Sequence, residues 1–404
     1  MVRKLTNIMD TLRNLYKIGN GPSSSHTMGP KIAAEKFKSK NKDATKFEVE
    51  LYGSLASTGK GHLTDFIIKQ TLGMDITNII FREDIVYKYH SNGMLFKAFK
   101  GDEKVDEWLV FSVGGGELKN LNEDRSGKYT SVYKHTNMSD ILAYCNSKNI
   151  SFYDYVIENE GIEILEYANK IIEVMFNSIE QGIKKEGVLP GNLHVLRRAK
   201  NFYDKYLEDK SLTTLAFASS LAVAEENASG AVIVTAPTCG ASGVVPGVLY
   251  TYYKCKNIDM KKIKEGLLVG GLIGNIIKHN GSISGAEVGC QGEVGAACSM
   301  AAAAITYIEG GTNEQIEYAS EIALEHHLGL TCDPVQGYVQ IPCIERNAMS
   351  CKRAIDACNF ALLTDGKHYI HLDDAIETML ETGHDLNANY KETSLGGLAK
   401  TKIC

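Results

Sequence analysis

The sequence predicts an α+β N-terminal domain followed by a mostly α-helical domain. Short segments with alternating apolar and polar residues lie early in the chain, and apolar residues recur at helical spacing after about residue 140. With 404 residues, the chain is long enough for two hydrophobic cores. We therefore expect an α+β domain over residues 1–140, a helical connector over residues 141–190 and an all-helical domain over residues 191–404.

The N-terminal region is predicted to combine short strands with helices. Residues up to about 40 predict a short helix, the Gly-Pro loop IGNGPSSSHT and a second helix from Met28 to Ser39. The segment KFEVELY alternates apolar and polar positions and predicts a strand over residues 46–52. The SLASTGKGH loop then leads into a helix with apolar residues at Phe66, Ile67 and Leu72. Further short strands are expected at residues 78–81, 85–89, 94–99 and 108–113.

The second half of the chain predicts a helical bundle whose loops meet at one site. Glycine is enriched, with 38 residues, and it concentrates in connections such as TAPTCGASGVVPG, HNGSISGAEVGCQG and CDPVQGYVQIPC. Glycine in such loops allows the backbone to pack close to a ligand. The expected helices cover residues 161–185, 211–227, 242–253, 261–278, 296–308, 313–328 and 373–380.

Composition excludes several classes of function. The net charge of −6, from 43 basic and 49 acidic residues, argues against a nucleic-acid or anionic-membrane partner. The N-terminus lacks the pattern of a signal peptide, and the longest apolar run, GLLVGGLIGNII, is too short to span a bilayer and suits a closely packed buried helix. We therefore expect a cytoplasmic protein whose ten cysteines are reduced thiols and ligands.

Three cysteines lie in Gly- or Pro-containing loops. Cys290, Cys332 and Cys343 each have small, Pro or Gly neighbours, which allow a sulfur to approach an inorganic centre. Cys298 lies in an Ala-rich run and is interpreted as a core thiol. Three thiolates are too few to close a structural zinc site, but three anchor a cubane cluster and leave one iron free as a Lewis acid. From spacing alone, ordinary buried thiols remain an alternative.

Polar residues and histidines cluster at two predicted helix starts. The segment SSSHT, residues 23–27, contains more polar residues than one helix cap requires, and backbone N–H groups at a helix start suit a carboxylate. The alternative is a plain capped helix. His62 lies near the start of the next helix, where the helix dipole lowers imidazole basicity. The GKG sequence beside it lacks the spacing of a phosphate-binding loop.

The segments GPSSSHTMGP, GAEVGCQGEVG and CDPVQGYVQIPCIERNA resemble the iron-sulfur L-serine dehydratases (L-serine ammonia-lyases) of bacteria in their single-chain form. The resemblance runs from about residue 18 to the C-terminus, is weakest over about residues 75–187, and includes the intervals between the three loop cysteines. Gln336 departs from the family, which usually has Gly or Ala there.

The resemblance implies a lyase that converts L-serine to pyruvate and ammonia, with a 4Fe-4S cluster whose open iron is a Lewis acid. It implies an amino-acid substrate, a homodimer and a role in amino-acid catabolism and gluconeogenesis. Another cluster-dependent lyase or hydratase, acting on threonine, cysteine or a hydroxy acid, and a non-catalytic iron-sulfur sensor remain alternatives. The implied site residues are Cys290, Cys332, Cys343 and Cys404 as iron ligands, His62 as base, His26 at the substrate carboxylate (with the two histidine roles exchangeable), and Ser24, Ser25 and Thr27 as substrate-binding residues.

Overall fold

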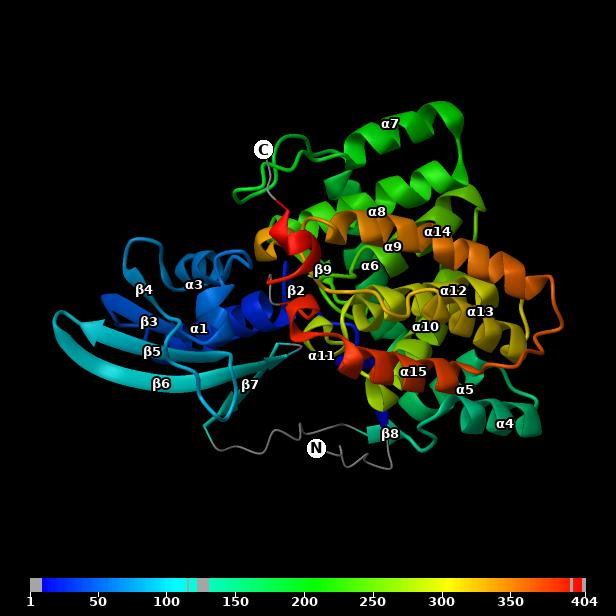
Figure 1. Ribbon diagram of the computed structural model, residues 1–404, viewed down its shortest axis with the longest axis horizontal. Coiled ribbons are helices and arrows are strands. Elements are labelled where there is room, and N and C mark those ends of the chain that lie inside the picture. Colours follow the sequence, from blue (N-terminus) through cyan, green and yellow to red (C-terminus); the bar gives the residue numbers. More distant parts are fainter. Residues whose placement is uncertain (1–8, 115, 122–130, 393–394, 402–404) are drawn as a thin grey trace.

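The computed structural model describes residues 9–114, 116–121, 131–392 and 395–401. A sheet with its helices forms one part of the molecule, and a larger assembly of helices forms the other (Figure 1). The predicted fold class, an α+β N-terminal region followed by a mostly helical part, is confirmed.

The sheet of the first part is mixed. Strands β3 and β4 are parallel, and the other neighbours are antiparallel. The predicted strand over residues 46–52 is observed with the same bounds. In spatial order the strands are β4 (Thr77–Arg82), β3 (Lys46–Tyr52), β5 (Gly93–Lys100), β6 (Glu103–Gly114) and β7 (Glu117–Asn120).

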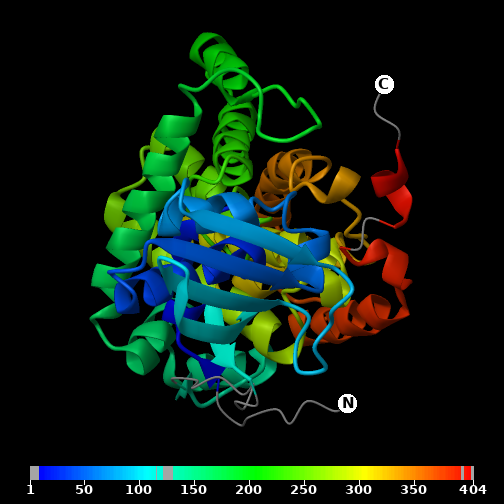
Figure 2. The same ribbon diagram turned by 90° about the vertical axis from the view of Figure 1, so that its left-hand side faces the viewer.

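Helices α1 (Gly29–Lys40) and α3 (Thr64–Leu72) cover one face of this sheet. Phe37 of α1 packs against Phe96 of the sheet, with ring centroids 5.5 Å apart. The opposite face carries charged pairs such as Lys97 with Glu50, and Figure 2 shows the sheet nearest the viewer. This alternation between a buried and a polar face is the property that made the strands recognisable in the sequence.

The strand predicted at residues 85–89 is wrong. The segment forms turns and irregular structure, and Ile85 and Val86 are exposed. Tyr87 instead packs edge-on against Tyr52 and Phe111. The alternation therefore reflects aromatic packing against the sheet rather than a strand within it.

Two helices form the centre of the larger part. Helix α10 (Met260–Asn280) is buried from Gly266 to Ile277. Almost every residue of α12 (Ala296–Ile308) is buried as well. A Cβ added at Gly270 would lie 2.5 Å from the carbonyl oxygen of Met300, so the glycines let the two helices pack closely. No helix in the described ranges is both long and apolar enough to cross a membrane.

The remaining helices surround this pair. The sequence missed α14, because its start in the CDPVQGYVQIPC segment was interpreted as loop, and α7, which is mostly exposed and therefore lacks a strong apolar pattern. The helices are α4 (Met138–Lys148), α5 (Phe152–Glu160), α6 (Ile164–Gly182), α7 (Ala199–Asp209), α8 (Leu212–Ala228), α9 (Val244–Cys255), α13 (Asn313–Glu325), α14 (Cys343–Leu362) and α15 (Leu372–Asp385), with the short α2 (Ser54–Ser57) and α11 (Gly285–Val288).

The N-terminal segment packs with the helices rather than with the sheet. Strand β1 (Met9–Asp10) pairs with β8 (Ser131–Tyr133), and β2 (Ile18–Asn20) pairs with β9 (Val232–Val234). Between β1 and β2 the chain forms only one 3-10 turn, at Leu12–Asn14. The short helix predicted for this segment is therefore wrong in the described residues. The reason is tertiary: the apolar side chains of this segment, Tyr16 among them, are buried in the helical core. The predicted domain limits at residues 140 and 190 remain predictions.

Candidate functional site

The SSSHT segment forms a π-helical turn (Ser24–Met28) immediately before α1. Ser23 caps the turn, because its hydroxyl accepts a hydrogen bond from the backbone N–H of His26. Ser25 hydrogen-bonds Nδ1 of His26 at 2.8 Å. Ser24 is half-buried at the start of the turn. Widened turns of this kind are frequent at functional sites.

Both candidate histidines lie side by side in this region. The rings of His26 and His62 have centroids 4.6 Å apart. Thr27 is fully buried and donates a hydrogen bond to the carbonyl oxygen of His62, while Thr64 donates to that of His26. Two reciprocal threonine bonds therefore fix the two segments against each other. The Thr27 hydroxyl is thus occupied by a structural hydrogen bond, whereas the serines of the turn are only half-buried.

His62 has one nitrogen available for chemistry. Its Nδ1–H donates to the carbonyl oxygen of Thr58 at 3.0 Å, which leaves the lone pair on Nε2. Nε2 is buried and makes no hydrogen bond within the described residues. Burial lowers the pKa of His62 and lowers that of His26 still further. Both rings are thus neutral near pH 7. The cause is burial, not the helix dipole that the sequence suggested.

The C-terminal segment brings a carboxylate to His62. Oε1 of Glu392 lies 3.9 Å from Nε2 of His62. The backbone N–H of Glu392 donates to the carbonyl oxygen of Cys332, and the N–H of Cys332 donates to Tyr390. His62, from the first part, and Cys332, from the second, therefore contact the same short segment.

The three loop cysteines meet at the ends of helices. Cys343 is the first residue of α14, and Cys290 precedes the π-helical turn (Gln291–Gly295) that leads into α12. The Cys290 and Cys332 thiols hydrogen-bond each other, which lowers the pKa of Cys290 and raises that of Cys332. Arg346, one turn after Cys343, hydrogen-bonds Cys290. Burial raises the pKa of Cys343.

A buried acidic group lies beside these cysteines. Glu293 is 3.8 Å from the Cys332 sulfur, and burial raises the pKa of Glu293 to about 8. A Cβ at Gly285 would lie 2.6 Å from Glu293 and 3.0 Å from the Cys332 sulfur, so only glycine lets the backbone pack this close to both groups. Burial also raises the pKa of Glu392 to about 7.

The arrangement of the cysteines fits a cluster better than a single ion. Thiolates that share one zinc ion lie about 4 Å apart, because Zn–S bonds are about 2.3 Å long. Cys290, Cys332 and Cys343 do not form a set with all three sulfurs within 4.8 Å of one another, although all three belong to the described residues. Three thiolates whose sulfurs do not all converge on one point, beside a glycine that lets the backbone approach the Cys332 sulfur, suit an inorganic cluster.

The other predicted residues have separate positions. Cys298 is buried in α12, and its thiol contacts the carbonyl oxygen of Ser350, so its interpretation as a core thiol is confirmed. Cys404 lies outside the described residues. The nearby tail is held, because Leu398 N–H donates to Asp333 at 2.7 Å. Asp333, which follows Cys332 in the chain, therefore accepts a hydrogen bond from the backbone of the tail.

Sequence reasoning missed Glu392 and Arg346. Arg346 carried a usable signal, since it follows Cys343 by one helical turn if a helix begins at that cysteine. Glu392 carried none. Its backbone has a φ of 58° and its neighbours in the chain form no motif, so only the folded C-terminal segment brings it to His62.

Comparisons with known proteins agree on one family. Residues 82–399 match the family model of the serine dehydratase alpha chain, and residues 11–75 match that of the serine dehydratase beta chain. L-serine dehydratase 2 of Escherichia coli (strain K12) is 39% identical, over 97% of this chain and 98% of its own. The L-serine dehydratase of Haemophilus influenzae is 39% identical (98% and 100%), and that of Mycobacterium tuberculosis is 40% identical (96% and 96%).

Asn347 provides a test of how the site is held together. Its buried amide accepts from Gly243 N–H and donates to the carbonyl oxygens of Gly240 and Cys343. We expect Asn347→Leu to lower the free energy of unfolding by about 2–4 kcal/mol, since buried polar groups would be left unpaired. Urea unfolding measures this loss. The exposed Asn177→Leu, the matched control, should change stability by less than about 0.5 kcal/mol. Equal losses in both variants would contradict this role.

Proposed function

The chain belongs to the serine dehydratase family, and from this premise we propose that it eliminates water from L-serine to give pyruvate and ammonia. The proposal rests on one observation: a neutral, buried His62 with an unpaired Nε2 lies beside a segment that is hydrogen-bonded to Cys332. A base and a thiol-rich centre at one site are what this elimination requires. The homodimer and the cytoplasmic location remain predictions from the sequence.

We propose that Cys290, Cys332 and Cys343 hold a 4Fe-4S cluster. Their sulfur donors, the close backbone approach at Gly285 and the positive charge of Arg346 support this assignment. When bound, a cluster with an open iron supplies a Lewis acid that makes the β-hydroxyl of serine a better leaving group.

His62 is the proposed base. Its Nε2 accepts the proton from Cα of serine, the Cα–Cβ double bond forms, and the C–O bond at Cβ breaks as hydroxide leaves. The hydrogen bond from Nδ1–H to Thr58 keeps the tautomer that this step needs. Glu392, 3.9 Å from Nε2, is placed to stabilise the imidazolium that results. The enamine product then tautomerises and hydrolyses to pyruvate and ammonia without further catalysis.

The substrate carboxylate is assigned to the turn before α1. Ser24 and Ser25 are half-buried there, and His26 is oriented by hydrogen bonds between its two ring nitrogens and the hydroxyls of Ser25 and Ser54. Thr27 contributes indirectly, because its hydroxyl holds the His62 backbone. The single N–H of a neutral His26 already donates to one of these hydroxyls, so it would donate to a carboxylate that replaces that serine as its partner.

The decisive experiment uses protein purified without oxygen. Iron and sulfide are quantified, and pyruvate formation is followed with L-serine, L-threonine, L-cysteine and a hydroxy acid. Four irons and four sulfides per chain with preferred turnover of L-serine would support the proposal. Preferred turnover of another substrate would identify a different lyase, and a cluster without turnover of any substrate would indicate a sensor.

Replacing any one of Cys290, Cys332 or Cys343 by Ala should remove both iron and activity, because a cluster loses a third of its protein anchors. Iron analysis and the pyruvate assay measure both. The matched control is Cys298→Ala, which should keep its iron and change only packing. A triple variant that still binds full iron and sulfide would show that the ligands lie elsewhere.

The variant His62→Ala should lower kcat by about 10²- to 10⁴-fold, the usual contribution of a general base, and leave the iron content unchanged. The exposed His326 serves as a matched control, and His326→Ala should retain normal turnover. Comparable loss in His26→Ala with near-normal turnover in His62→Ala would exchange the two assignments.

We also propose that Cys404 would supply a fourth thiolate to a bound cluster in the absence of serine. The hydrogen bond from Leu398 to Asp333 keeps the described end of the tail beside the residue after Cys332, which supports this reach. Cys404→Ser should change the absorption spectrum of the cluster, accelerate iron loss in air and alter the dependence of rate on serine. If all three properties match the parent protein, Cys404 is not a ligand. The half-buried Cys255→Ser is the control.

A further inference from the structure

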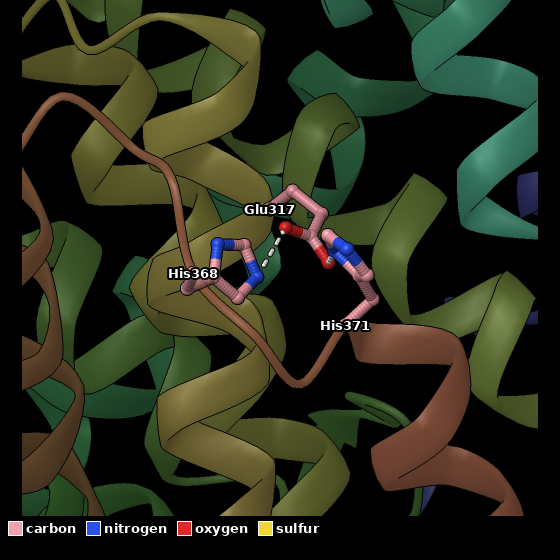
Figure 3. Close-up of side chains that lie close together, drawn as sticks. All are labelled: Glu317, His368 and His371. Carbon is pink, nitrogen blue, oxygen red and sulfur yellow. Dashed lines mark ion pairs between the residues drawn. The ribbon is translucent and has the colours of Figure 1, made fainter.

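A second group of potential ligands lies away from the cysteines. Figure 3 shows Glu317 of α13 between His368, in the loop after α14, and His371, the residue that caps α15. Their ligand atoms all lie within 4.8 Å of one another. We propose that Glu317, His368 and His371 bind one divalent transition-metal cation, such as zinc, separately from the cysteine site.

The distances suit such an ion. Nε2 of His368 is 2.8 Å from Oε2 of Glu317, and Nδ1 of His371 is 3.8 Å from Oε1. With metal–ligand bonds of about 2.1 Å, neighbouring ligand atoms lie about 3.0 Å apart in octahedral and about 3.4 Å apart in tetrahedral geometry. At 2.8 Å, Glu317 and His368 lie slightly inside the octahedral spacing, so a small outward shift would admit the ion. His371 is half-exposed and is free to approach by rotation of its side chain.

The bonding of His368 points to a cation. Its Nδ1–H donates to the carbonyl oxygen of Gly366 at 2.8 Å, which leaves Nε2 as the nitrogen that can bind a cation. This nitrogen is buried, makes no hydrogen bond in the described structure and faces a carboxylate oxygen, which is also an acceptor. Two buried acceptors at this distance repel unless a proton or a metal cation lies between them. A histidine that donates its other N–H to a backbone carbonyl is the usual arrangement of a metal ligand.

The surroundings hold these side chains in place. The ring of Tyr318 stacks on His368 at 4.1 Å with an interplanar angle of 7°. Oε1 of Glu317 accepts a hydrogen bond from Leu372 N–H at 2.7 Å. Both first contacts of the ion would therefore be fixed before it binds, which reduces the entropy lost on binding.

Charge and access favour a cation as well. Within the described residues, the ion pairs of Glu317 are with the two histidines and with no Lys or Arg. One turn further along α13, Glu321 is buried and its Oε1 has no hydrogen-bond partner there. A cavity of about 260 Å³, lined by Ser139, Glu317 and His371 among others, gives an entry path. Imidazole nitrogens select transition metals over Mg²⁺ or Ca²⁺.

The test uses full-length protein purified without oxygen, freed of loosely held metal by a weak chelator and then titrated with zinc chloride. After desalting, we expect the parent to retain one more zinc per chain than His368→Ala/His371→Ala, with equal iron in both. Any zinc on the cysteines cancels in this comparison. The exposed His384→Ala is the matched control and should retain zinc like the parent. Equal zinc in the parent and the double variant would overturn the proposal.

A second variant separates metal binding from a simple ion pair. Glu317→Gln still accepts the Leu372 hydrogen bond but lacks the charge, so we expect zinc affinity, measured by calorimetry, to fall by more than the ~10- to 100-fold typical of losing an outer partner of a metal ligand. Zinc should raise the Tm of the parent by more than that of the double variant. If zinc raises neither Tm, the three side chains form only an ion-pair cluster and no metal site exists.

Discussion

The structure depends on the attachment of the N-terminal segment to the helical core. Asn20 donates to the carbonyl oxygen of Gly230, 210 positions later in the chain, beside the antiparallel pair of β2 and β9. The Tyr16 hydroxyl reaches the backbone of Leu267 in the central helix α10. Because the SSSHT turn follows β2 directly, these contacts fix its position relative to the cysteine loops. The sheet domain then contributes His62 to a site that it could not form alone.

Burial sets the electrostatics of this site. The two histidines are neutral because water is excluded from them, and the same burial raises the pKa of Glu293 and of Glu392. Buried histidines that stay neutral, beside buried carboxyl groups with raised pKa values, are suited to exchanging a proton. At the cysteine thiols the environment differs, because the guanidinium of Arg346 places a positive charge beside Cys290. The proposed elimination uses both: one environment accepts a proton, and the other stabilises the departing hydroxide.

Closely packed helices hold the loops of this site at fixed positions. Helices α10 and α12 pack through glycine at positions where any side chain would meet backbone, so they form a closely packed base for the loops. Helix α12 follows Cys290 directly, and α14 begins at Cys343. Helix α15 runs between the two candidate ion sites, since His371 caps its start and Thr382 near its end donates to Gln291, the neighbour of Cys290. The same element thus contacts both sites.

The sequence by itself determined the fold class, most helices, the strand over residues 46–52 and that Cys298, unlike Cys290 and Cys332, lies within a helix. These features depend on local periodicity and on Gly and Pro, which act within a few residues. Tertiary structure alone decided that residues 12–14 form one turn, that Thr27 binds backbone, that Glu392 meets His62 and that Glu317 meets two histidines about 50 residues away. Such contacts join segments that are far apart in the chain and share no local pattern. They arise from how helices and loops pack, and a pattern over a few residues does not predict that packing.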